Sequence, residues 1–285
     1  MTTDNTREGI PLIPEGITFP TLSKFSGATG KVKVEEYTER IKKYNEKARS
    51  TLNIFSFNDN EVRGSNLFAN VELVSECIAL PSELEHAVRL NSSYFRNTYE
   101  DMGLVIRTDG DSITRNDYVA KYLAEQLKKR GIEFPARVSL RGLTLKEDDN
   151  SLYGLVFLIG DSAEVLHLPK FAHENNKRSF SRTDERGVPL FDESGDRTFY
   201  TRKDGISRLY LSRDLNLYSS DENLADSGGN GRVVIVGGEA AGADLVREYT
   251  AKENANLSAL KEKLNTQHRQ HTEEIDALAQ RLKLG

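Results

Sequence analysis

The feature that most constrains the fold is a change of hydrophobic period near Pro135. Before this residue, apolar side chains recur every three or four positions, as on the buried face of a helix. After it, short apolar or alternating runs follow one another about every ten residues, with turn sequences between them. The sequence therefore predicts an α+β protein: a mainly helical N-terminal domain, an antiparallel β sandwich or small barrel in the middle, and a long C-terminal amphipathic helix.

Helical periodicity predicts several helices before Pro135. The first carries one apolar stripe from Val34 to Ala48, and the others cover residues 67–78, 82–90 and 114–130. The last has the clearest boundaries, with a capping-box pattern at its start and Gly131 after its basic last turn. Cys77 falls on the apolar side of the second of these helices, where a thiol behaves as a small hydrophobe.

The strand-like runs after Pro135 are joined by polar turns. The strongest hairpin signal is Lys203-Asp204-Gly205, which lies between two alternating segments. The run from Leu152 to Ile159 is nearly all apolar, as expected of a strand covered on both faces. A last strand is predicted at residues 232–236.

Both ends of the chain differ from its middle. Residues 1–30 are rich in Pro and Gly yet hold many apolar side chains, which predicts an extended arm lying on its own body or on a neighbouring subunit. Residues 240–285 predict a helix with a partial heptad register and a polar middle. The domains are therefore 1–30, 31–135, 136–237 and 240–285. The residues expected to mediate self-association are Ile13, Phe19, Leu257, Leu260, Leu264 and Leu278.

Charge and composition exclude several classes of protein. Net charges of −2, +1 and −4 for residues 1–135, 136–213 and 214–285 give no segment the character of a basic nucleic-acid-binding domain. No apolar run is long enough to span a membrane, and the N-terminus does not resemble a signal peptide. We expect a cytoplasmic or virion protein with no membrane partner. The single cysteine, Cys77, excludes an intramolecular disulfide and multi-thiolate metal sites.

The motifs that could carry chemistry each have a simpler structural explanation. The run Val233–Ala243 resembles a dinucleotide fingerprint, but Glu239 stands where the pyrophosphate needs glycine, so we expect a strand-to-helix turn. His167 and His173 match none of the short-spaced zinc motifs. No local catalytic motif is present, so we expect no enzyme, no cofactor and no metal, although an active site assembled from distant residues stays an alternative.

A stripe of arginines and aromatic residues between positions 177 and 213 is the best functional signal. Arginines that follow phosphates and rings that stack on bases are typical of surfaces that bind single-stranded nucleic acid. The alternative structure is an aromatic core face with arginine on the solvated side, which the near-neutral charge of this region favours. The candidate nucleic-acid-binding residues are Arg178, Phe180, Arg182, Arg197, Phe199, Arg202, Arg208 and Tyr210.

The arm, the terminal helix and the lack of catalytic motifs together predict a non-enzymatic structural or assembly protein. We expect it to self-associate, or to bind other protein subunits, through its two ends. Phage or virus particles and other large prokaryotic complexes contain such components, although that placement is an analogy from architecture. The alternative function is single-stranded nucleic-acid binding through the Arg/aromatic β surface, with nucleic acid as the partner.

Overall fold

The computed structural model describes residues 22–48, 52–53, 55–108, 116–174, 176–236, 262, 265–272 and 275. The chain divides into two compact units, Met1–Glu239 and Ala240–Gly285, each described here by itself. None of the helices within these ranges is both long and apolar enough to cross a membrane.

The first unit is built around a large curled mixed sheet, which has nine strands within the described ranges. Eight strands follow the order β10-β9-β11-β13-β12-β4-β5-β8, and β14 pairs with β4. The strands are β4 (Tyr99–Ile106), β5 (Ala136–Ser139), β8 (Val165–His167), β9 (Lys177–Thr183), β10 (Pro189–Phe191), β11 (Arg197–Tyr200), β12 (Ile206–Leu211), β13 (Leu217–Tyr218) and β14 (Gly231–Arg232).

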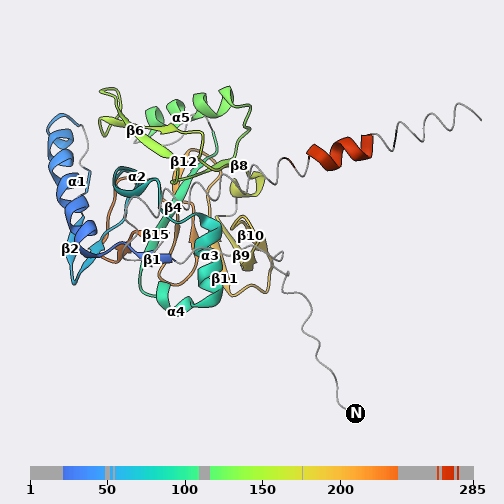
Figure 1. The fold of residues 1–285 in the computed structure, drawn as a ribbon, viewed down its shortest axis with the longest axis horizontal. Helices are drawn as coiled ribbons and strands as arrows, with labels where there is room; N and C mark the ends of the chain where they lie inside the picture. The colour runs from blue at the N-terminus through green and yellow to red at the C-terminus, as the bar shows by residue number, and fades with distance from the viewer. Residues whose placement is uncertain are drawn as a thin grey trace, which may run out of the picture. The chain divides into compact units, whose positions relative to one another are not determined.

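Shorter elements surround this sheet. Three two-stranded pairs are β1 (Leu22–Lys24) with β15 (Val234–Val236), β2 (Ser56–Asn58) with β3 (Glu61–Arg63), and β6 (Leu143–Glu147) with β7 (Leu155–Ile159). The helices are α1 (Gly27–Lys47), α2 (Leu67–Val74), α3 (Pro81–Leu90), α4 (Ser92–Phe95), α5 (Asp117–Lys129) and the 3₁₀ helix η1 (Pro169–Phe171). In Figure 1, β4 and β12 run through the middle of the unit, while α1 and α5 lie on its outside.

The predicted fold class is wrong, because strand β4 comes from the segment assigned to a helical domain. It pairs with β12 on one side and with β5 and β14 on the other. From Glu100 to Ile106 every residue of β4 is buried. A strand buried on both faces has a continuous apolar run and lacks the alternation by which strands are recognised. The helices and the strands therefore share one sheet-centred body.

The predicted antiparallel pairing is also wrong, because β11 and β13 are parallel. The Asp-Gly turn forms, with Gly205 at φ +73°, yet it does not join two paired strands. After β12 the chain reverses at residues 212–216 and returns as β13, which inserts between β11 and β12. A two-residue strand is too short for its periodicity to show in the sequence.

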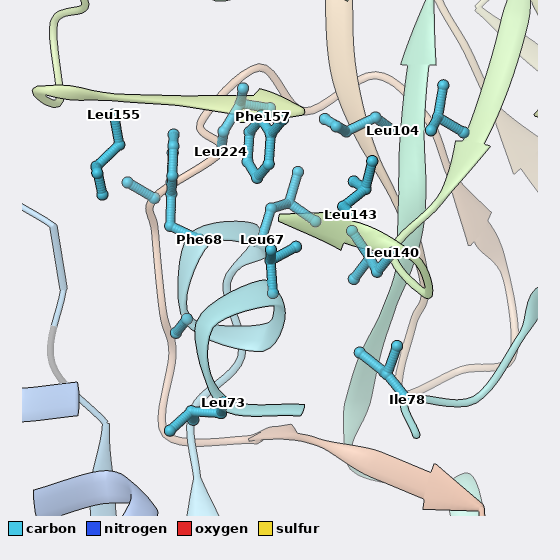
Figure 2. Packing of buried hydrophobic residues seen from close by; sticks show 14 of the residues in the cluster. Leu67, Phe68, Leu73, Ile78, Leu104, Leu140, Leu143, Leu155, Phe157 and Leu224 are labelled. Carbon is cyan, nitrogen blue, oxygen red and sulfur yellow. The ribbon is translucent and has the colours of Figure 1, made fainter. Parts of the chain in front are cut away.

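Apolar side chains cover both faces of the sheet. One cluster joins the sheet to α1, α2, α5, β6 and β7, and the other lies against α3, α4 and η1. In the first, the rings of Phe68 and Phe157 stack with their centroids 4.6 Å apart, and Figure 2 shows Phe68 reaching from α2 towards β7. Both side chains are 0% exposed. Each buried side chain of this size contributes about 1.5–3 kcal/mol of hydrophobic stabilisation.

Arg107, the residue after β4, is hydrogen-bonded to η1, to β12 and to the residues that follow β11 and β13. This guanidinium is 4% exposed, and its described hydrogen-bond partners are neutral oxygens. It donates to the carbonyls of Phe171 (2.8 Å) and Ser219 (2.5 Å), and to the hydroxyls of Thr201, Ser207 and Ser219. Burial lowers its pKa to about 9, helped by the charge of Arg202.

The described residues include a part of each predicted chain end. Leu22 begins β1 and Phe25 lies in the core, so the last part of the predicted arm is folded into the first unit. In the second unit the described helix is short, Asn265–Ile275, so the predicted long C-terminal helix is wrong. All described residues of this helix are exposed, and Ile275 is 64% exposed. A polar helix without a buried face gains little from packing, which limits its length.

Candidate functional site: a tyrosine-lined groove

Four tyrosines from four adjacent strands form a row across the sheet, which we call the tyrosine row: Tyr99, Tyr210, Tyr218 and Tyr200. Strand register creates it, since Tyr218 lies directly opposite Tyr210 on one side and Tyr200 on the other. Directly opposed side chains lie close enough to interact. Ring centroids are 5.1 Å apart for Tyr210 and Tyr218, and 4.2 Å apart for Tyr218 and Tyr200, with both pairs stacked. Tyr99 meets Tyr210 edge-on at 5.8 Å.

An open groove of about 440 Å³ lies along this row. Three tyrosines of the row line it together with the end of β12, the turn into β13 and a glycine-rich loop. The lining residues are Tyr99, Tyr210, Ser212, Arg213, Asp214, Tyr218, Gly228, Gly229 and Asn230. The groove therefore combines large amphipathic rings with small polar groups and backbone.

A buried ion pair supports the tyrosines from below. Arg208 is 3% exposed and Asp101 is 2% exposed; they lie on the adjacent strands β12 and β4 in diagonal positions, since Arg208 is opposite Leu104 and Asp101 is opposite Tyr210. The guanidinium donates two parallel hydrogen bonds to the carboxylate, Nε to Oδ1 at 2.9 Å and Nη2 to Oδ2 at 2.7 Å. Burial alone would lower the pKa of Arg208, but its interactions with Asp101, Tyr99 and Asp221 together outweigh burial and raise it, so the guanidinium stays charged.

Arg208 also fixes the rings above it. Its guanidinium carbon lies 5.5 Å from the ring centroid of Tyr99 and 5.2 Å from that of Tyr210. Cation–π contacts of this kind are worth about 0.5–2 kcal/mol each. The same side chain donates to the carbonyls of Ser65 and Asp226. The floor of the groove is thus tied to the core and held rigid.

Tyr99 connects the row to the glycine-rich loop. Its hydroxyl donates to the carbonyl of Ser65 at 3.0 Å and accepts from the backbone N–H of Gly228 at 2.8 Å. The hydroxyl of Ser65 donates to Asp101 at 2.6 Å and accepts from Asn70 at 2.9 Å. A continuous hydrogen-bonded chain therefore runs from α2 to the rim of the groove.

Other hydroxyls at the groove keep their bonding capacity. Within the described part of the chain, the Tyr210 hydroxyl makes no hydrogen bond, and the buried Ser212 hydroxyl has no partner. Burial raises the pKa of Tyr99 and of Tyr210. Burial, together with its hydrogen bond to Tyr200, raises the pKa of Tyr218. These phenols stay protonated at neutral pH, and because Tyr99 already donates to Ser65 and Tyr218 is hydrogen-bonded to Tyr200, Tyr210 is the one of the three whose proton remains for a ligand.

The charges at the rim nearly cancel. Arg213 and Asp214 are 67% and 68% exposed, and their closest atoms are 3.9 Å apart. At that exposure and distance the pair contributes little to stability, so both groups are available to a ligand. At the far end of the row, Lys177 lies 5.5 Å from the ring centroid of Tyr200.

Glu100 lies beside the site, on the other face of β4 from Asp101. The residue is 1% exposed; Thr98 donates to Oε1 at 2.5 Å, while Oε2 has no hydrogen-bond partner. Burial raises the pKa of this carboxyl to about 8, and the charges of Lys24 and Arg232 only partly oppose that rise. Glu100 is therefore largely uncharged at neutral pH.

The structure brings two of the predicted nucleic-acid-binding residues to the groove. Tyr210 lines it and Arg208 lies beneath it, but Arg208 is neutralised by Asp101. Phe180 and Phe199 are 0% exposed in the second core cluster, so their rings are closed to bases.

The remaining arginines of the predicted stripe lie elsewhere. Arg197 makes a two-pronged ion pair with buried Glu85, and Arg202 pairs with Glu222 at 3.2 Å. Arg178 stacks 3.6 Å from the ring centroid of Phe191. Arg182 is exposed. Most of these cations are thus engaged with carboxylates or rings of the protein itself.

The predicted self-association residues Ile13, Phe19, Leu257, Leu260, Leu264 and Leu278 lie outside the described residues. Most of the glycine motif lies outside them as well, and its strand forms β15, paired with β1.

The groups considered for chemistry lie apart from the groove. His167 is exposed, and its Nδ1 lies 2.9 Å from the carbonyl of Glu133. No set of three or more His, Cys, Asp or Glu side chains in the described ranges could hold a metal ion. Cys77 lies in the turn after α2, three residues beyond its last residue Val74, and burial raises its thiol pKa to about 11.

Sequence reasoning missed Tyr99, Tyr218 and the loop at residues 228–230 as parts of one site. The available signal was the repeated tyrosine in neighbouring strands, but the pairing of β13 with both β11 and β12 is needed to align them.

The fold and the site together define a mixed α/β protein with a rigid tyrosine-lined groove. Comparison of the chain with protein-family models, curated proteins and solved structures returns no match.

Proposed function

We propose that this protein is a recognition component of a protein assembly and that the tyrosine-lined groove binds a polypeptide. The observation that carries the proposal is the composition of the groove: three tyrosines with Ser212, Asn230, two glycines and one Arg–Asp pair. Tyrosine supplies contact area at low entropy cost, while Ser, Gly and Asn supply adaptable hydrogen bonds, as in antibody paratopes. Protein-binding surfaces are similarly enriched in Tyr and Arg.

The direction of the rings favours a polypeptide over stacked bases. Tyr200, Tyr218 and Tyr210 stack on one another, so their faces are largely covered and their edges and hydroxyls are presented. A peptide offers carbonyls and N–H groups to such hydroxyls, whereas base stacking needs open ring faces. The rim also lacks the unopposed cations that phosphates require, since Arg213 has Asp214 beside it.

Rigidity supports the same function. The Asp101–Arg208 pair and the hydrogen bonds of Tyr99 hold the floor of the groove before any partner arrives. A preorganised surface loses less entropy on binding and therefore binds more tightly for the same contacts. The expected role as an assembly component agrees with such a surface.

Gentle purification of the full-length protein from producing cells tests this function. Tyr210→Ala should release the co-purifying protein or further copies, while Tyr122→Ala should retain them. Tyr122 is a matched control because it is a partly exposed tyrosine on α5, outside the groove. Equal retention by both variants, or a groove-dependent species that nuclease removes, would overturn the proposal.

A further inference from the structure

We propose that the occupant of the groove is the N-terminal segment 10–20 of a second copy of this chain. The inference rests on the proposed function and deepens it by naming the partner. It joins two observations: a tyrosine-lined groove with free hydrogen-bond donors, and a proline-spaced segment ahead of the first described residue, Leu22.

The sequence of the segment matches the chemistry of the groove. Residues 10–20 read Ile-Pro-Leu-Ile-Pro-Glu-Gly-Ile-Thr-Phe-Pro, which contains the spacing Pro11-x-x-Pro14. Such segments favour the polyproline II conformation, and aromatic-lined grooves bind it in several families of recognition domains. A segment of this kind is rich in carbonyl acceptors and poor in N–H donors. The groove offers complementary donors, the hydroxyl of Tyr210 and the side-chain amide of Asn230.

The charges are also complementary. Glu15 is the one charged residue of segment 10–20. Arg213 is the one cation among the groove-lining residues, and its contact with Asp214 is long and exposed. Docking would let Glu15 pair with Arg213 while the apolar side chains Leu12 and Ile13 contact the tyrosine rings. The rest of the segment is uncharged, as the nearly neutral groove requires.

Strand direction favours a second copy as the source of the segment. β1 pairs antiparallel with β15, so Lys24 lies opposite Val234 and Leu22 lies opposite Val236. The groove is at the other end, where β14 pairs with Tyr99 just before residue 234. The N-terminal end of β1, at Leu22, is therefore the end farther from the groove of the same copy. Reciprocal exchange of the segment between two copies would produce a closed symmetric oligomer.

Photo-cross-linking of the full-length protein tests this inference. A benzophenone amino acid is placed at Leu12, and unlabelled and ¹⁵N-labelled chains are mixed before irradiation. Peptide mass spectrometry should find the cross-link on residues 209–218 or 228–230, and in pairs of one light and one heavy chain. The double variant Pro11→Ala/Pro14→Ala should lower the yield about fivefold or more, because the segment loses its preorganisation. Tyr218→Phe, which removes only a hydroxyl, should lower it too, while Tyr122→Phe should not.

Cross-links to another surface, cross-links only within one copy, or a yield unchanged by the proline substitutions would overturn the inference. A second benzophenone placed at Tyr218 separates this failure from failure of the proposed function. If the Tyr218 probe captures a different protein while the Leu12 probe misses the groove, the groove binds a polypeptide but not this segment. If the Tyr218 probe captures no polypeptide, both proposals fail.

Discussion

Replacing Glu100 by Gln should stabilise the protein in alkaline solution and leave its stability nearly unchanged in acid. The carboxyl is 1% exposed, and one of its oxygens has no hydrogen-bond partner. Ionising it requires a charge to be placed where water cannot reach. Gln has the same shape and never carries that charge.

The magnitude follows from the pKa of the carboxyl. Burial raises the pKa of Glu100 from 4.5 to about 8, and each pKa unit corresponds to about 1.4 kcal/mol. Because the folded state holds the proton more tightly than the unfolded state, stability is fully present below pH 4.5 and falls as pH rises to about 8. The wild-type protein should therefore lose about 5 kcal/mol of unfolding free energy over this range relative to Glu100→Gln.

Urea unfolding at several pH values between 4.5 and 9 measures this difference. The two proteins should have similar free energies of unfolding at pH 4.5, and the variant should gain steadily until about pH 8. Glu46→Gln on the exposed face of α1 is the matched control and should show no such trend. A constant difference between wild type and Glu100→Gln at all pH values would refute the reasoning.

Two further substitutions and one chemical reaction test buried groups of the first unit. Arg208→Met should cost about 3–5 kcal/mol of unfolding free energy, because it leaves the Asp101 carboxylate buried without its partner, and the added change Asp101→Leu should recover part of that loss in denaturant melts. Arg107→Leu should cost about 2–5 kcal/mol, since it removes the hydrogen bonds that the guanidinium donates to five buried oxygens, and an unchanged urea midpoint would contradict this. The Cys77 thiol, with its pKa raised to about 11, should react with iodoacetamide at pH 8 about a hundredfold more slowly than a free thiol, a rate that mass spectrometry follows directly.

Local pattern predicts the elements of this fold better than their pairing. The predicted stripe from Val34 to Ile41 lies in α1. The predicted helix that stops at Gly131 corresponds to α5, and Gly131 follows it with a positive φ. The sequence does not predict strand β4, because the apolar residues from Met102 to Ile106 follow neither a helical nor an alternating period. Its place in the centre of the sheet depends on β5, β12 and β14, which follow it by many residues. Such long-range pairing leaves no local signal.

The same limit applies to the candidate site. Arg197 and Arg208 looked like free cations because their partners Glu85 and Asp101 lie 112 and 107 residues away in the sequence. Only the register of β12 against β4, and of β13 against its two neighbours, assembles the tyrosine row. The sequence identified Tyr210 and Arg208 as members of a stripe, while the fold decides that one faces the groove and the other supports it.

The most direct test of the groove as a polypeptide-binding surface is a comparison of two photo-cross-linking positions in producing cells. A benzophenone amino acid at Tyr218 lies in the groove, and the same amino acid at Tyr122 lies on α5 outside it. We expect position 218 to cross-link to a polypeptide, another copy of this chain above all, and position 122 to give no comparable product. Equal products from the two positions, or cross-links from position 218 to nucleic acid alone, would contradict the account.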